Sequence, residues 1–140
     1  MRYHETLLQV RFYEVDPYGM VWHGHYTGWF EVGRNELTEL FGLGPFQLKE
    51  KGLLAPVVAL RCEFKQPARF GDSLIIQTTL ERTEVAKLIF HYRIVQKGNG
   101  RISATGSTTH VLTDLNGSLL YRVPPDVLEK IEEMRKYLEV

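Results

Sequence analysis

The chain has 140 residues, the length of one ordinary domain, with 44% hydrophobic and 24% charged residues. Its 17 basic and 17 acidic side chains cancel, which excludes a disordered chain and a nucleic-acid or membrane-surface binder that works by bulk positive charge. A single cysteine excludes a disulfide framework and a multi-cysteine zinc site. Because the chain has no apolar signal core and no run of roughly 18 apolar residues, we expect one soluble cytoplasmic domain over residues 1–140.

The chain begins with a predicted strand and a turn. Residues 7–12 alternate, so that Leu8, Val10 and Phe12 share one face of a strand. Residues 16–19 contain a proline and a glycine that forbid regular structure, and they predict the turn that follows.

A long helix is predicted next, over about residues 25–41. Apolar residues recur there every three or four positions, and Gly42 and Gly44 end the pattern. Gly28 and Gly33 each cost a helix about 1 kcal/mol relative to alanine. We therefore expect both glycines at places where the helix lies close to another backbone, which indicates a helix buried against a sheet.

The remainder of the chain predicts antiparallel strands and a terminal helix. Alternating apolar residues run through 60–64, 74–80 and 88–94, a long strand is expected over 102–112, and Asn99 with Gly100 marks a hairpin. In the first of these strands we expect Leu60, Cys62 and Phe64 to face inward. After two prolines, an amphipathic helix is expected with these residues inward: Val127, Leu128, Ile131 and Met134. The order predicts an α+β fold in which one curved antiparallel sheet of about five strands wraps one long helix, with a short helix at the C-terminus.

Residues 11–26 carry the most chemical information. They place Asp16, His23 and His25 in the loop that enters the long helix. A helix N-terminus presents unpaired N–H groups that stabilise an oxyanion, and a carboxylate beside it can act as general base or nucleophile. The alternative is an Asx turn, in which Asp16 only caps the turn before Pro17.

This segment resembles the active-site segment of hotdog-fold acyl-CoA thioesterases of the 4-hydroxybenzoyl-CoA thioesterase family, including the Tol-Pal-associated enzymes. The matching residues are Asp16, Gly19, Val21, Trp22, His23 and Tyr26, followed on the helix by Glu31, Arg34 and Glu36. The likeness continues through Phe64 and residues 67–72, so it covers most of the chain. Glu14 and Val15 stand where many relatives carry Asp-Thr, which leaves the branch and the substrate open.

The resemblance implies the catalytic roles. Asp16 attacks the thioester carbonyl or activates the water that does, and His23 positions the carbonyl or the water. Backbone N–H groups of Gly24, His25 and Tyr26 hold the oxyanion, and losing such a donor typically costs about 3–4 kcal/mol.

The resemblance also implies how the substrate is bound. The residues expected to contact the acyl group and the thioester arm are Trp22, Phe46, Ala55, Pro56 and Val57, with ordinary core packing as the alternative for this region. Arg82 and Lys87 are the candidates for the phosphates of coenzyme A, against a solvated hairpin as the alternative. Glu31 is a reserve catalytic carboxylate, although a local ion pair with Arg34 also explains it. No cofactor is expected, because coenzyme A is part of the substrate.

Several other functions are alternatives to hydrolysis of a small acyl- or aryl-CoA. A metal site at His23 and His25 lacks a third ligand at suitable spacing. Ser73 stands in a Gly-Asp-Ser-Leu string without the downstream Asp-x-x-His that such esterases need. A hotdog hydratase or dehydratase and a non-catalytic acyl-CoA-binding module remain the alternatives. We expect homodimers that pair sheet edges with the active site at their seam, and the common further assembly is a tetramer.

Overall fold

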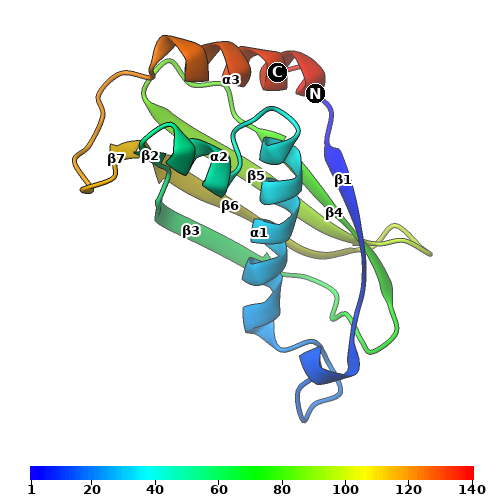
Figure 1. Cartoon of the computed structure of the whole chain (residues 1–140). Helices are drawn as coiled ribbons and strands as arrows, with labels where there is room; N and C mark the ends of the chain where they lie inside the picture. The colour runs from blue at the N-terminus through cyan, green and yellow to red at the C-terminus, as the bar shows by residue number, and fades with distance from the viewer.

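The computed structural model describes residues 1–140 and shows a long helix packed on a curved five-stranded antiparallel sheet (Figure 1). In chain order the elements are β1 (His4–Gln9), η1 (Phe12–Glu14), α1 (His23–Glu39), α2 (Pro45–Glu50), β2 (Leu53–Leu54), β3 (Val57–Phe64), β4 (Ser73–Leu80), β5 (Lys87–Gln96), β6 (Ile102–Val111), β7 (Thr113–Asp114) and α3 (Pro125–Leu138). The sheet order is β1-β4-β5-β6-β3, and β2 pairs with β7 separately. The predicted α+β architecture is confirmed. None of the helices has the length and hydropathy that crossing a membrane requires.

The centre of the sheet follows the alternation in the sequence. Every second residue of β4 and β5 is buried beneath α1, namely Leu74, Ile76, Thr78 and Leu80 on β4 and Leu88, Phe90, Tyr92 and Ile94 on β5. The ring of Phe30 on α1 stacks on the Tyr92 ring with 4.5 Å between centroids. Burial of these rows supplies the main apolar contact between helix and sheet.

The two glycines of α1 have different surroundings. A Cβ on Gly33 would lie 2.7 Å from both Ile76 and Thr78 of β4, so the predicted close approach is confirmed there. A Cβ on Gly28 would meet nothing within 4 Å, so the same prediction is wrong for Gly28, which lies on the exposed face of the helix. The helix itself begins and ends two residues earlier than the periodicity suggested.

Three local expectations are corrected. β1 ends at Gln9, before the backbone turns into η1, and this leaves Phe12 80% exposed. Leu128 is half-exposed, because the buried face of α3 is formed by other residues, Val127, Ile131, Met134 and Leu138. The short helix α2 was not predicted, although Gly44 as N-cap and Pro45 at the first helical position are good starting residues for a helix.

Strand β3 is an edge of the sheet with an apolar surface. It pairs with β6 on one side only, and its other side carries unpaired backbone groups. Four of its apolar side chains are between 45% and 57% exposed, namely Val57, Val58, Leu60 and Phe64. The expectation that Leu60 and Phe64 point into the core of the single chain is therefore wrong, because α1 covers β3 only in part and both side chains stay about half exposed.

Candidate active site

The loop that carries Asp16 is closed by backbone hydrogen bonds. An antiparallel bridge joins Val15 to Val21, and the Asp16 N–H donates to the Met20 carbonyl at 2.8 Å. The Val21 N–H donates to the carbonyl of Ala68, which is buried beyond the end of β3, at 2.8 Å. The loop is thereby fixed both to itself and to the edge of the sheet.

One oxygen of the Asp16 carboxylate is held and the other is free. Oδ1 accepts the N–H of Tyr18 at 2.8 Å and the N–H of Met20 at 3.4 Å. These contacts form the Asx turn that the sequence allowed as an alternative. Oδ2 accepts no hydrogen bond within the chain, and the side chain is half-buried. The turn therefore does not compete with a chemical role, because it orients the carboxylate and leaves one oxygen for a substrate or a water.

Asp16 faces a cavity of about 350 Å³, which we call the Asp16 cavity. It is lined by Asp16, Tyr18, Met20, Val21, His23, Tyr26, Phe64, Lys65, Gln66, Pro67 and Ser103. The His23 ring makes no hydrogen bond and lies against Phe64, with 6.3 Å between centroids. The Tyr26 hydroxyl accepts the Ala68 N–H at 3.2 Å, and burial raises the pKa of Tyr26, so this phenol stays protonated at neutral pH. The structure thus brings Asp16, His23 and Tyr26 together.

The N-terminus of α1 offers a free backbone donor beside this cavity. Trp22 is the N-cap and supplies no side-chain cap. The His25 N–H donates to the Trp22 carbonyl at 3.0 Å, whereas the Gly24 N–H has no partner. Of the three expected oxyanion donors, the N–H groups of Gly24 and Tyr26 have no partner outside α1, and that of His25 is already engaged. The Trp22 ring covers Gly24 so closely that a Cβ there would lie 2.1 Å from Cζ3.

Glu14 is a buried neighbour of the Asp16 loop that the sequence showed only as a departure from the family pattern. Its carboxylate is 6% exposed and accepts the Trp29 Nε1–H at 3.1 Å through Oε2 and the Arg11 N–H at 2.8 Å through Oε1. Its backbone carbonyl accepts the Trp22 N–H at 2.9 Å. A buried carboxylate therefore ties the loop before Asp16 to the middle of α1, and only the tertiary structure reveals this contact.

The expected acyl-binding residues lie at the other end of the sheet edge. Asp16 lies at the Phe64 end of β3, whereas residues 55–57 open that strand. Phe46, on α2, is 80% exposed and does not line the Asp16 cavity. Within one chain, these residues do not meet Asp16.

The expected charged residues are also apart from Asp16. Glu31 is exposed and pairs with Arg34 at 3.5 Å, which is the local ion pair considered above. Arg82 pairs with Glu84 at 3.5 Å, and Lys87 lies opposite Val111, at the far end of the sheet. The nearer cations are two others: Lys65 lines the cavity, and Arg69 donates to the Gly19 carbonyl at 3.5 Å.

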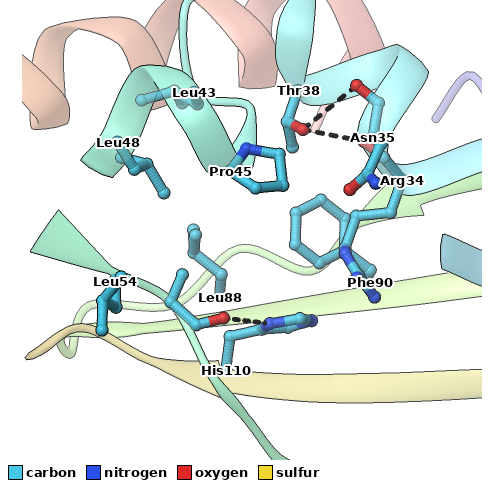
Figure 2. A pocket seen from close by; sticks show the side chains of 11 residues that line it. Arg34, Asn35, Thr38, Leu43, Pro45, Leu48, Leu54, Leu88, Phe90 and His110 are labelled. Carbon is cyan, nitrogen blue, oxygen red and sulfur yellow. Dashed lines mark hydrogen bonds between the residues drawn. The ribbon is translucent and has the colours of Figure 1, made fainter. Parts of the chain in front are cut away.

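A second cavity of about 110 Å³, which we call the Arg34 cavity, lies between α1, α2 and the sheet (Figure 2). It is lined by Arg34, Asn35, Thr38, Leu43, Pro45, Leu48, Leu54, Ala55, Leu88, Phe90 and His110. Arg34 reaches from α1 toward His110 on β6 (Figure 2). The sequence did not predict this cavity, because its walls come from segments far apart in the chain.

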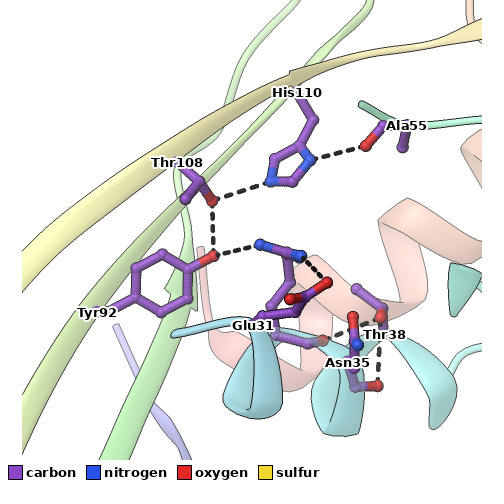
Figure 3. A network of polar contacts seen from close by, with 8 residues as sticks. Glu31, Asn35, Thr38, Ala55, Tyr92, Thr108 and His110 are labelled. Carbon is purple, nitrogen blue, oxygen red and sulfur yellow. Dashed lines mark hydrogen bonds and ion pairs between the residues drawn. The ribbon is translucent and has the colours of Figure 1, made fainter. Parts of the chain in front are cut away.

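A chain of hydrogen bonds connects Tyr92, Thr108 and His110 (Figure 3), and Arg34 Nη1 lies 3.5 Å from the Tyr92 hydroxyl. His110 Nδ1 lies 2.9 Å from the Ala55 carbonyl, which can only accept, so Nδ1 carries the proton. His110 Nε2 then accepts the Thr108 hydroxyl at 2.9 Å, and Thr108 lies 2.6 Å from the Tyr92 hydroxyl. Burial lowers the pKa of His110, with the Arg34 charge adding to the effect, so the imidazole is neutral.

No group of three His, Cys, Asp or Glu side chains is arranged to hold a metal ion. His23 stays a single exposed imidazole in the Asp16 cavity. The His25 ring lies between the rings of Trp22 and Trp29, with centroid distances of 5.4 Å and 6.4 Å.

Comparison with known proteins gives consistent results. The family model described as the thioesterase-like superfamily matches residues 10–131. The Bacillus subtilis (strain 168) protein named "Putative acyl-CoA thioesterase YneP" is 31% identical over 107 residues, which are 76% of this chain and 77% of that protein. A hypothetical protein, TT1821 from Thermus thermophilus, has a crystal structure with a TM-score of 0.83 at 31% identity, over 93% of this chain and 98% of that chain. The DHNA-CoA thioesterase from Staphylococcus aureus shares the fold, with a TM-score of 0.86 at 24% identity over 97% of this chain and 93% of that chain.

Proposed function

Because the chain belongs to the thioesterase-like superfamily and has the predicted hotdog fold, we propose that it is a thioester hydrolase. We propose further that the substrate is a small acyl- or aryl-CoA and that the reaction takes place at Asp16. One observation supports the assignment above the others. The Asp16 carboxylate has one oxygen fixed by backbone amides and one free oxygen, and it lines a cavity together with His23, the first residue of α1, where the next N–H, that of Gly24, is free. A purely structural Asx turn needs neither the cavity nor the free amide.

The reaction follows from these groups. As a general base, Asp16 takes a proton from water while the water oxygen attacks the carbonyl carbon. As a nucleophile, Asp16 attacks that carbon itself, and water then hydrolyses the anhydride. On both routes the Gly24 N–H stabilises the oxyanion, His23 orients the carbonyl or the water, and the C–S bond breaks to release the CoA thiolate and the free acid.

The phosphates of coenzyme A need cations near the mouth of the Asp16 cavity. Within one chain, Lys65 and Arg69 are closer to Asp16 than Arg82 and Lys87 are. Alanine variants of the two pairs, compared with wild type, test the assignment. Alanine substitution of the pair that binds the phosphates is expected to raise the KM for acyl-CoA. The KM for an acyl-pantetheine, which lacks the nucleotide phosphates, is expected to stay unchanged.

We propose that the active protein is a homodimer joined through β3. The edge is unpaired and its side chains are apolar, which favours pairing with a second copy. The expected acyl contacts, Phe46 and residues 55–57, then reach Asp16 across the seam. Light scattering of the purified protein measures the assembly and separates a dimer from the expected tetramer, and Leu60→Lys on β3 is expected to shift it toward monomer.

Thiol release from a panel of acyl-CoAs tests the function, with short-chain, long-chain, 4-hydroxybenzoyl and phenylacetyl esters. Asp16→Asn is expected to lower kcat at least about 100-fold. The exposed Asp126 is paired with Lys51 on another face and provides the matched control, so Asp126→Asn is expected to retain activity. Release of no thiol by wild type from any ester contradicts the proposal, and full activity in Asp16→Asn moves the chemistry to another carboxylate such as Glu31. Enoyl-CoA hydration, measured in parallel, tests the hydratase alternative.

A single turnover in ¹⁸O-water distinguishes the two roles of Asp16. Label incorporated into the Asp16 carboxylate indicates the nucleophilic route. Label found only in the released acid, with no acyl-enzyme adduct in the mass spectrum of a rapidly quenched turnover, indicates general-base catalysis, because water attack on the acyl carbon of an anhydride would also label the acid.

A further inference from the structure

We propose that the Arg34 cavity of the partner chain receives the far end of the acyl group, and that Arg34 selects acyl groups ending in an oxygen acceptor, above all a carboxylate. The inference rests on the proposed function, because it requires the thioester to lie at Asp16. It goes beyond that function by naming the substrate class and the residue that recognises it.

The position of the cavity follows from the free edge of the sheet. A strand that pairs with its own copy about a two-fold axis is antiparallel to that copy. The start of β3, where Ala55 lines the Arg34 cavity, therefore lies opposite the partner's end of β3, where Phe64 lines the Asp16 cavity. Each Asp16 cavity thus meets an Arg34 cavity from the other chain.

Within one chain the distance is too long for a small acyl group. Arg34 lies about three turns beyond His23 on α1, or about 16 Å along the helix axis. A short acyl group with its carbonyl at Asp16 ends well before that point. Recognition by Arg34 therefore has to occur between chains.

The chemistry of the cavity calls for an acceptor. The Arg34 side chain is 13% exposed, and its nearest acceptors, the Tyr92 hydroxyl and Glu31 Oε1, both lie at 3.5 Å, the outer limit of a hydrogen bond. The Asn35 side-chain amide has no hydrogen bond. His110 offers no further donor, because its Nδ1–H is bonded to the Ala55 carbonyl.

The guanidinium of Arg34 therefore retains several N–H donors without a close partner, in a mostly buried position. A carboxylate matches this fork with two parallel hydrogen bonds. An alkyl end would leave the same donors buried and unpaired. This penalty on the alkyl substrate is larger than the net gain from the hydrogen bonds that the carboxylate makes. A hydroxyl or carbonyl oxygen satisfies the donors in part.

The size of the cavity limits the group to a short one. An apolar cavity of about 150 Å³ holds a benzene molecule. The Arg34 cavity, at about 110 Å³, accommodates a few carbon atoms along Leu43, Leu48 and Leu88 with the oxygen function at Arg34. The substrates expected to be preferred are CoA monothioesters of short dicarboxylic acids. CoA thioesters of hydroxylated acyl groups are expected to rank second.

Matched substrates test this selection. Wild type is expected to prefer adipoyl-CoA to hexanoyl-CoA, which has the same chain length without the carboxylate, and 4-hydroxybenzoyl-CoA to benzoyl-CoA by a smaller factor. Arg34→Gln is expected to lower kcat/KM for adipoyl-CoA about 10- to 100-fold and to raise kcat/KM for hexanoyl-CoA by a small factor, because the donors that the alkyl end leaves unpaired are gone. Arg34→Lys is expected to be intermediate on adipoyl-CoA. Arg101→Gln, in the exposed β5–β6 hairpin, is the control and changes neither substrate.

The outcomes separate the inference from the proposed function. If wild type hydrolyses both six-carbon esters equally, or if Arg34→Gln slows both equally, the selection is refuted while the hydrolase stands. If no ester is hydrolysed, the proposed function itself fails. Asn35→Leu removes the second donor without touching the ion pair, so a reduced adipoyl preference in this variant supports the site even if Arg34→Gln folds poorly.

A heterodimer tests the contribution of the partner. Chains carrying Asp16→Asn and chains carrying Arg34→Gln are co-expressed with different tags, and the mixed dimer is purified on both. If Arg34 acts across the seam, one site combines the intact Asp16 of one chain with the intact Arg34 of the other, and about half of the wild-type activity on adipoyl-CoA returns. If Arg34 acts within its own chain, neither site is intact and the activity stays low, which overturns the proposal.

Discussion

Replacing Glu14 tests how the catalytic loop is held on α1. Its carboxylate accepts hydrogen bonds from the Trp29 indole and the Arg11 amide, and Trp29 is itself 5% exposed. Each hydrogen bond to a charged acceptor contributes about 1.5–3 kcal/mol, and the indole N–H is left without a buried partner when the carboxylate is removed. The relief of carboxylate desolvation offsets part of this loss. We therefore expect Glu14→Ala to lower the free energy of unfolding by about 2–4 kcal/mol.

A double-mutant cycle isolates the contact with the indole. Glu14→Gln, Trp29→Phe and the double variant are compared with wild type by urea unfolding at one fixed protein concentration, because assembly affects apparent stability. The coupling free energy between the two positions is expected to be about 1.5–3 kcal/mol. Glu84, which is 84% exposed, is the control position for losing a carboxylate.

The same variants connect the loop to catalysis. Glu14 stands two residues before Asp16, so loss of its contacts lets the loop move and is expected to lower kcat more than it raises KM. A coupling free energy near zero, or Glu14→Ala with wild-type kcat, would refute the reasoning that this carboxylate positions the loop.

Three further outcomes follow from packing and burial. Gly28→Ala is expected to raise the free energy of unfolding by up to about 1 kcal/mol, because its Cβ meets nothing. Gly33→Ala is expected to lower it through an overpacking penalty of about 1–3 kcal/mol against β4. Urea unfolding measures both, and equal effects would contradict the different surroundings of the two glycines. Gly24→Ala is expected to displace the Trp22 ring, which tryptophan fluorescence reports, and to lower kcat for thiol release with little change in secondary structure. An unchanged kcat would contradict the role of the Gly24 amide as an oxyanion donor. Because the pKa of His110 is lower in the folded chain, the unfolded chain binds the extra proton, so stability falls as pH drops below about 6.5, by at most about 1.4 kcal/mol per pH unit. Urea midpoints of wild type and His110→Gln between neutral and mildly acidic pH measure this slope, which the variant should lack.

Sequence reasoning succeeded where local pattern and burial agree. The alternation in β4 and β5 is strict because both strands lie in the middle of the sheet, with α1 over one face. It failed for Leu60 and Phe64 because an edge strand has no neighbour on one side, and alternation alone does not show which strand is at the edge. Gly28 and Gly33 are the same residue in one helix, and only the sheet beneath distinguishes them.

The candidate site was predictable only where it is local in the chain. Asp16, His23 and Gly24 lie within one short segment, which the sequence placed at the entry to a helix, although the helix already begins at His23. Arg34 and His110 are far apart in the sequence and line one cavity only because α1 packs over the sheet that contains β6. No spacing rule in the sequence predicts that cavity. The acyl-binding roles proposed for Phe46 and residues 55–57 require a second chain, which the sequence of one chain describes only indirectly.

The closed loop of residues 16–20 has a consequence for how this enzyme can diverge. Its ends are joined by main-chain contacts, the bridge between Val15 and Val21 and the bond from Val21 to Ala68, and the Asp16 carboxylate adds bonds to main-chain N–H groups of the loop. Main-chain contacts do not depend on which side chains the loop carries. Tyr18 lines the Asp16 cavity and is 81% exposed, and its side chain makes no hydrogen bond. Position 18 is therefore a place where mutation can retune substrate preference while the catalytic carboxylate keeps its orientation, and it is the first position to randomise in a directed-evolution library.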